Sequence, residues 1–239
     1  MMDQGHIASA FDRDLDAVQA LIMKMGGLVE TAISDAARAL EMRDTELGEQ
    51  VRQNDKLIDE LEEQVASEVA RVIAMRSPAA GDLRTVLSVL KISGNLERMG
   101  DYAKNLGKRT AVLSEMPAIT GTGGALRRMT QLVNLMLKDA LDAYIQRDVE
   151  LAINVRQRDA DVDQMYNALF REFLTHMMED PRNITACMHL HFIAKNVERM
   201  GDHVTSICEQ VIYLVTGEMP DEDRTKTDRT STDSTLGKV

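Results

Sequence analysis

The chain has 239 residues and a formal net charge of −11, with 28% charged and only 3% aromatic residues. An acidic chain of this kind lacks the lysine- and arginine-rich surface that binds nucleic acid or anionic membranes, so we expect neither partner. Plentiful Leu, Ala, Val and Met, with four prolines and no tryptophan, favour long helices over sheets.

No apolar run reaches the roughly 18 residues that cross a bilayer. The first residues lack the basic and apolar segments of a secretory signal. Cys187 and Cys208 form no metal-type pair and are expected to be buried thiols in a reducing compartment. We therefore expect a cytoplasmic protein with no direct membrane insertion.

Apolar periodicity and turn residues predict six helices, at about residues 9–42, 45–76, 80–112, 123–146, 149–178 and 182–216. Helices of about thirty residues extend roughly 45 Å, and the short turns between them favour antiparallel neighbours. Residues 116–124 collect one proline and three glycines and are predicted to be a linker. Residues 219–239 are almost free of apolar side chains and are expected to be a disordered tail.

The second half of the chain repeats the first. Residues 41–65 match 145–169 at an offset of 104, and the pentapeptide E-R-M-G-D occurs at 97–101 and again at 198–202, at an offset of 101. Pro78 and Pro181 mark the same turn in each copy. The repeat predicts an all-α fold of two tandem antiparallel three-helix bundles related by pseudo-two-fold symmetry. The first bundle would span residues 1–115 and the second 125–218.

Each copy carries two pairs of acids, and the members of each pair are one helical turn apart. The eight residues are Asp55, Asp59, Glu97 and Asp101 in the first copy and Asp159, Asp163, Glu198 and Asp202 in the second. On a helical wheel the E-R-M-G-D acids continue the apolar stripe of their helix, and the D-x-x-x-D acids lie on the rim of the apolar arc of theirs. If the two helices are antiparallel neighbours, four carboxylates converge in each copy.

Two interpretations of these acids remain open from spacing alone. Converging carboxylates repel one another unless they are solvated, protonated or bridged by cations, and oxygen ligands favour Mg²⁺, Mn²⁺, iron or Ca²⁺. The alternative is a set of rim acids that pair with nearby Arg or Lys or are solvated. Recurrence of both pairs in the duplication favours metal binding. No His or Cys accompanies the first set, which weakens the case for a closed zinc site.

The stretches N-L-E-R-M-G-D and N-V-E-R-M-G-D, each with an upstream D-x-x-x-D, resemble the motifs of the PhoU family of phosphate-transport accessory regulators. The resemblance covers about residues 5 to 216. The chain has Met99 and Met200 where the family usually has Ile after Arg. The family's common His after Asp is present as His203 but is Tyr102 in the first copy.

The resemblance implies two three-helix bundles, often as a homodimer, and multinuclear clusters of the iron or zinc type held by the eight acids, with manganese or magnesium as further options. It implies negative regulation of the phosphate-starvation response, in which the protein links the ATPase of the Pst phosphate transporter to the PhoR sensor kinase. It implies no enzymatic activity.

Two other classes of protein are alternatives to this adaptor. A ferritin-like di-metal enzyme uses Glu-x-x-His, which occurs nowhere in the chain, and neither G-x-S-x-G nor a phosphate-binding P-loop is present. We therefore predict no catalytic residues. A metal-free helical interaction module stays open as the second alternative.

Overall fold

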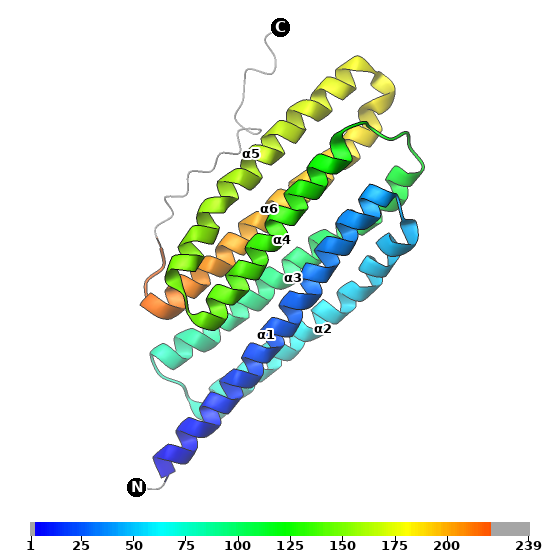
Figure 1. Cartoon of the computed structure of the whole chain (residues 1–239). Coiled ribbons are helices and arrows are strands. Elements are labelled where there is room, and N and C mark those ends of the chain that lie inside the picture. The colour runs from blue at the N-terminus through cyan, green and yellow to red at the C-terminus, as the bar shows by residue number, and fades with distance from the viewer. Residues whose placement is uncertain (1–2, 221–239) are drawn as a thin grey trace.

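The computed structural model describes residues 3–220, with side chains from residue 11 onward. Six long helices are present over this range, and they run side by side along one direction (Figure 1). They are α1 (Asp3–Met42), α2 (Thr45–Arg76), α3 (Gly81–Ser114), α4 (Thr122–Gln146), α5 (Val149–Glu179) and α6 (Ile184–Thr216). A short 3-10 turn, Pro181–Asn183, precedes α6. No strand occurs within the described residues, so the all-α prediction is confirmed.

The predicted helices differ from the observed ones by a few residues at most, apart from an earlier start of α1. The 3-10 turn was not predicted, and it forms because Asp180 accepts a hydrogen bond from the amide of Arg182 at 2.9 Å. The expected disorder of the tail concerns residues that lie, from 221 onward, outside the described range. The predicted domain boundaries stay a prediction.

The same Arg-Asp turn ends the first helix of each copy. Arg43 and Arg147 adopt positive φ values of 55° and 53°, a left-handed conformation that non-glycine residues enter only when the surrounding structure holds them there. The next residue caps the following helix: Asp44 and Asp148 each accept the amide of the residue three positions on, at 2.9 Å in both copies. The duplication is therefore visible in the backbone itself.

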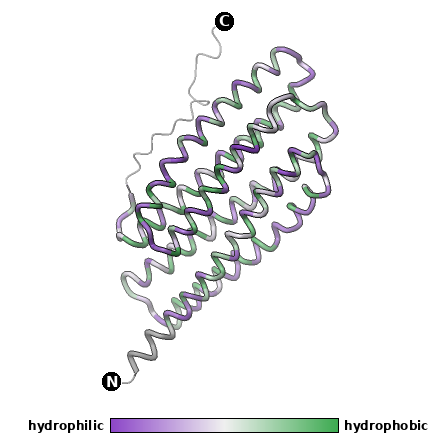
Figure 2. The backbone as a smooth tube through the Cα atoms, viewed as in Figure 1, coloured by the Kyte–Doolittle hydropathy of each residue, from purple (hydrophilic) through white to green (hydrophobic). Residues whose placement is uncertain are grey.

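The six helices pack as two groups of three. α1, α2 and α3 contact one another, as do α4, α5 and α6, and the groups meet where α3 contacts α6 and α1 contacts α4. Hydrophobic and hydrophilic residues alternate along each helix (Figure 2), and the buried apolar residues of both groups form one continuous core. None of the described helices is long and apolar enough to span a membrane.

Corresponding residues of the two copies meet between α3 and α6. The rings of Tyr102 and His203, which follow the Asp of each E-R-M-G-D, lie 5.6 Å apart between centroids. His203 Nδ1 is also 2.8 Å from Asn95 Oδ1 of the first copy. Contact between equivalent positions indicates that the pseudo-two-fold axis passes between these helices.

Candidate functional site

The four acids of the first copy lie on the facing sides of α2 and α3. Asp55 is 3% exposed, whereas Asp59, Glu97 and Asp101 are half-buried at the rim. Burial, with the neighbouring charges of Asp59 and Asp101, raises the pKa of Asp55 against the opposing effect of Lys104. The charges of Asp59 on α2 and Asp101 on α3 both act on Asp55, so acids of the two helices lie near one another in the first copy. The convergence of all four carboxylates stays a prediction.

A lysine lies between two of these carboxylates. Lys104 Nζ is 2.5 Å from Asp55 Oδ2 and 3.3 Å from Asp101 Oδ1. Hydrogen bonding to Asp55, followed by the charges of both acids, raises the pKa of the ammonium and keeps it protonated. Arg98 adds a weaker positive charge at the rim, 3.5 Å from Glu97 and 3.6 Å from Asp101.

Glu97, at the rim of the first set of acids, has a strongly raised pKa. Burial, followed by the charge of Asp101, raises its pKa to about 7, although Arg98 acts in the opposite direction. A carboxyl group with this pKa is partly protonated near neutral pH. In the first copy the negative charge of the acids is therefore balanced by Lys104, by Arg98 at the rim and by partial protonation of Glu97.

The acids of the second copy are more deeply buried. Asp159, Asp163 and Glu198 are 3%, 6% and 6% exposed, and Asp202 is half-buried. Lys195 Nζ lies 2.8 Å from Glu198 Oε1 and 4.9 Å from the centre of the Tyr166 ring. A lysine thus accompanies this set as well, but it precedes the E-R-M-G-D motif, whereas Lys104 follows it.

Close packing against the neighbouring helix explains why each E-R-M-G-D contains a glycine. A Cβ at Gly100 would lie 2.9 Å from Ile58 Cδ1 and 3.4 Å from Asp55 Oδ1. A Cβ at Gly201 would lie 2.6 Å from Asp159 Oδ1. The first acid of each D-x-x-x-D therefore sits against the bare backbone of the neighbouring helix. The two motifs form one packed unit.

The first set does not fit a metal ion as it is arranged, because an ion between Asp55 and Asp101 would have to displace the Lys104 ammonium. Over the part of the chain that the structure describes, no three His, Cys, Asp or Glu side chains are grouped to hold one ion. The predicted metal ligands are therefore placed at the helix interfaces, while metal binding itself stays a prediction.

The two lysines were missed from sequence. Aligning the copies at the offset of 101 pairs Lys104 with Thr205 and Lys195 with Gly94. The aligned copies therefore show in sequence that each has a lysine near its acids at a position where the other has none. The prediction of two buried thiols is confirmed, and Arg98 pairs with the neighbouring acids Glu97 and Asp101.

His191, which precedes Glu198 on α6, packs against aromatic rings. Its ring centroid lies 5.4 Å from that of Phe170 and 5.8 Å from that of Phe192. This environment indicates that packing is the main role of His191.

A duplicated six-helix protein with an acid pair on each of two facing helices per copy is a recognisable class. A family model for the PhoU domain matches residues 22–110 and 126–211. The chain belongs to the PhoU family. The two matched segments fall in the two copies of the repeat.

Curated relatives extend the match to nearly the whole chain. A Rhizobium meliloti protein is 42% identical over 100% of this chain and 99% of its own length. A Zymomonas mobilis protein is 47% identical over 93% of this chain and 94% of its own length. Both are named "Phosphate-specific transport system accessory protein PhoU homolog".

Two solved structures share the fold. The crystal structure of PhoU from Pseudomonas aeruginosa superimposes with a TM-score of 0.84 at 39% identity, and covers 87% of this chain and 100% of that one. The phosphate transport system regulatory protein PhoU from Streptococcus pneumoniae gives 0.81 at 31% identity, over 88% and 99% of the two chains. The predicted family and the two-bundle fold are confirmed.

Proposed function

We propose that this chain is an accessory protein of a phosphate-specific transport system. The observation that carries the proposal is end-to-end similarity to relatives named for that role, at 42% identity over the full chain. In the finer form of the proposal, the chain restrains the phosphate-starvation response when phosphate is plentiful.

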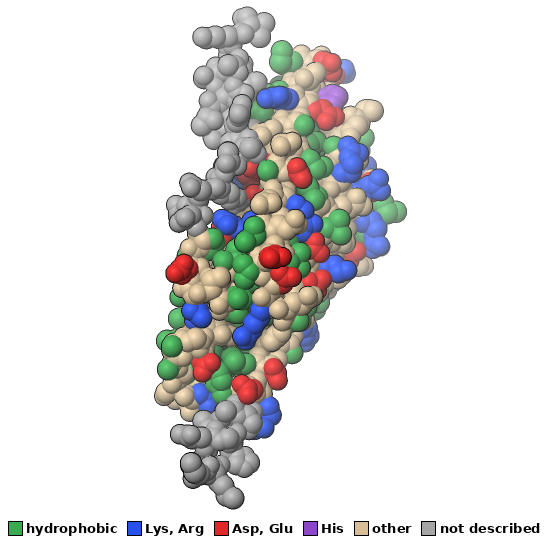
Figure 3. All heavy atoms as spheres, turned by 60° about the vertical axis from the view of Figure 1, so that its left-hand side comes forward, with side chains coloured by type: hydrophobic (Ala, Val, Ile, Leu, Met, Phe, Trp, Pro, Cys, Tyr) green, Lys and Arg blue, Asp and Glu red, His purple; other side chains and the backbone are tan. Residues whose placement is uncertain are grey.

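The proposed mechanism is protein contact. The chain would act in the cytoplasm, as a homodimer, between the ATPase of the Pst transporter and a PhoR-type sensor kinase. Acidic and basic side chains are interspersed with hydrophobic ones on the face shown in Figure 3, and such a mixed surface suits binding to proteins better than binding to a polyanion.

The proposed role is not enzymatic, in keeping with relatives that are named accessory proteins. It also does not require a metal ion. Lys104 already supplies a positive charge to the first set of acids, which favours the metal-free form of the adaptor over a cluster-dependent one.

Deletion of the gene tests the accessory role. In phosphate-rich medium, the deletion strain should express a phosphate-starvation reporter such as alkaline phosphatase at a high level, and a plasmid copy of the wild-type gene should repress it again. An unchanged reporter in a host that retains its Pst transporter and PhoR would contradict the proposal. Co-purification with the transporter ATPase and with the kinase then tests the two partners separately.

A further inference from the structure

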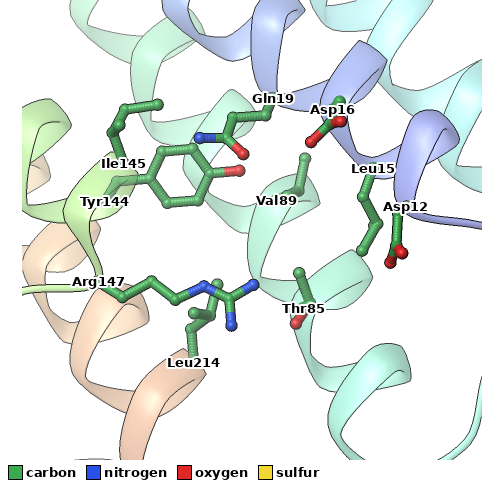
Figure 4. A pocket seen from close by; sticks show the side chains of 10 residues that line it. All are labelled: Asp12, Leu15, Asp16, Gln19, Thr85, Val89, Tyr144, Ile145, Arg147 and Leu214. Atoms are coloured by element: carbon green, nitrogen blue, oxygen red, sulfur yellow. The ribbon is translucent and has the colours of Figure 1, made fainter. Parts of the chain in front are cut away.

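A polar cavity of about 200 Å³ lies at the end of the molecule where the Arg-Asp turn after α4 meets three other helices. Figure 4 shows side chains from α1, α3 and the end of α4 around one space. The polar residues that line it are Asp12, Asp16, Gln19, Thr85, Tyr144 and Arg147. We call it the Arg147 cavity.

The duplication supplies a matched cavity of about 120 Å³ beside Arg43, the counterpart of Arg147. Its lining is apolar where the Arg147 cavity is polar: Leu40 corresponds to Tyr144, and Ala186 corresponds to Thr85. Residues 117–119 of the linker also line this second cavity.

The two arginines have different partners. Arg43 donates hydrogen bonds to the carbonyl oxygens of Leu113 and Met116, at the end of α3. The corresponding end of α6 is approached instead by Arg84, whose guanidinium lies against Gly217. The backbone amide of Arg147 donates to the carbonyl of Ala143, but within residues 11–220 its guanidinium makes no hydrogen bond or ion pair. In the first copy the Arg43 guanidinium binds carbonyl oxygen atoms. In the second copy the equivalent guanidinium of Arg147 faces the open space of the cavity.

The lining combines hydrogen-bond donors with acceptors. Arg147 is a charged donor and Gln19 offers an amide, whereas the Thr85 hydroxyl donates its proton to the Gly81 carbonyl at 3.1 Å and can only accept. Burial raises the pKa of Tyr144 to about 12, so its hydroxyl keeps its proton and can donate. Across the cavity, Asp12 and Asp16 of α1 present carboxylates, which only accept hydrogen bonds.

This combination selects for an oxyanion that carries a proton. A fully deprotonated anion would be attracted by Arg147 but repelled by Asp12 and Asp16, whereas a protonated one can donate its O–H to a carboxylate while its other oxygens accept from Arg147. Arg84 precedes the lining residue Thr85, and its guanidinium lies against Gly217, three residues beyond the lining residue Leu214, so it adds a second positive charge at this end of the molecule. The two arginines offset the two carboxylates.

We propose that the Arg147 cavity binds inorganic phosphate as hydrogen phosphate, with Arg147 and the neutral donors on its oxygens and Asp16 accepting its P–OH proton. The site goes beyond the accessory role and does not depend on it. Sulfate has no proton to donate at neutral pH. A phosphate monoester, with a second pKa of about 6, has lost its proton by pH 8, whereas inorganic phosphate still retains one.

The test is a calorimetric titration of the full-length chain at pH 8 and constant ionic strength with inorganic phosphate, sulfate and methyl phosphate. We expect saturable binding of phosphate, and binding of sulfate and methyl phosphate at least about tenfold weaker. The Arg147→Met variant should lose at least about tenfold in phosphate affinity. Arg128→Met changes an exposed arginine on α4, the helix that ends just before Arg147; it is the matched control and should bind as the wild type does.

The Asp16→Asn variant tests selectivity, because an amide can donate to an anion that carries no proton. It should lower the preference for phosphate over sulfate by at least about tenfold. Circular dichroism of each variant confirms the helical fold. The proposal is overturned if phosphate binding is absent, if sulfate binds as well as phosphate, or if folded Arg147→Met binds phosphate as the wild type does. Loss of binding leaves the reporter test of the accessory role unaffected, so the two can fail separately.

Discussion

The two copies of the repeat share a frame of acids but differ in the groups that surround it. In both, the first acid of the D-x-x-x-D lies against the glycine of the E-R-M-G-D on the neighbouring helix. The balancing cation differs: Lys104 bridges Asp55 and Asp101 in the first copy, whereas Lys195 pairs with Glu198 in the second. Each copy therefore has a lysine that pairs with its acids, but this lysine follows the E-R-M-G-D motif in the first copy and precedes it in the second.

The copies also differ where their last two helices cross. In the first copy Gly48 of α2 faces Gly107 of α3, and a Cβ at Gly107 would lie 2.5 Å from the carbonyl oxygen of Gly48. The corresponding residues of the second copy are Ala152 and Cys208, both fully buried. The α2–α3 crossing is backbone against backbone, and the α5–α6 crossing accommodates side chains.

The largest effect that should expose this difference comes from Gly107→Ala. The added methyl meets a backbone carbonyl that cannot rotate away, so we expect a loss of about 3 kcal/mol in the free energy of unfolding. Urea denaturation measures it. Gly94→Ala, where the added methyl meets nothing within 4 Å, is the control and should be neutral or more stable by up to about 1 kcal/mol. A Gly107→Ala variant as stable as the wild type would show that the crossing is not tight.

A smaller difference is expected between the two motif glycines. Gly201→Ala must displace the buried carboxylate of Asp159, which would lie 2.6 Å from the new Cβ, and should cost roughly 1–2 kcal/mol. Gly100→Ala meets the mobile end of Ile58 at 2.9 Å, and its better helix propensity offsets much of the strain. Denaturation of the two variants side by side gives the comparison, and equal losses would contradict the second copy's tighter packing around its acid.

The smallest effect concerns pH and the first copy. Since the pKa of Glu97 is raised from 4.5 to about 7, the folded chain holds a proton that the unfolded chain releases. Stability therefore falls as pH rises from about 4.5 to 7 and is level above that. Because the Glu97 side chain is 23% exposed, solvent screening limits this term to about 1 kcal/mol. Glu97→Gln should remove it.

Unfolding free energies at pH 5 and pH 8 test that prediction. The decrease from pH 5 to pH 8 should be about 1 kcal/mol smaller in Glu97→Gln than in the wild type. A variant with the same decrease would show that Glu97 titrates normally and that the charge of Asp101 is fully balanced by the neighbouring cations.

Much of this arrangement was predictable because it rests on periodicity. A 3.6-residue repeat places acids on an apolar stripe, and Arg-Asp and proline turns fix the ends of the helices, so the helices and the pairing of α2 with α3 acids followed from the sequence. Which ammonium reaches which carboxylate depends on side-chain packing between helices, and the bridge from Lys104 to Asp55 was missed. The Arg147 cavity was also missed, because four segments far apart in the chain form it.

The most direct test of the claim that Lys104 takes the place of a cation in the first copy is the metal content of the Lys104→Thr variant, which carries the residue found at the equivalent position 205. Both proteins are loaded with Mn²⁺, dialysed and analysed for bound metal. Asp55 would be left without its ammonium, so the variant should bind more Mn²⁺ than the wild type, and Mn²⁺ should raise its Tm more. The account would be contradicted by three results together: the wild-type chain binds Mn²⁺, the Asp55→Asn variant binds one equivalent less, and the Lys104→Thr variant binds no more than the wild type.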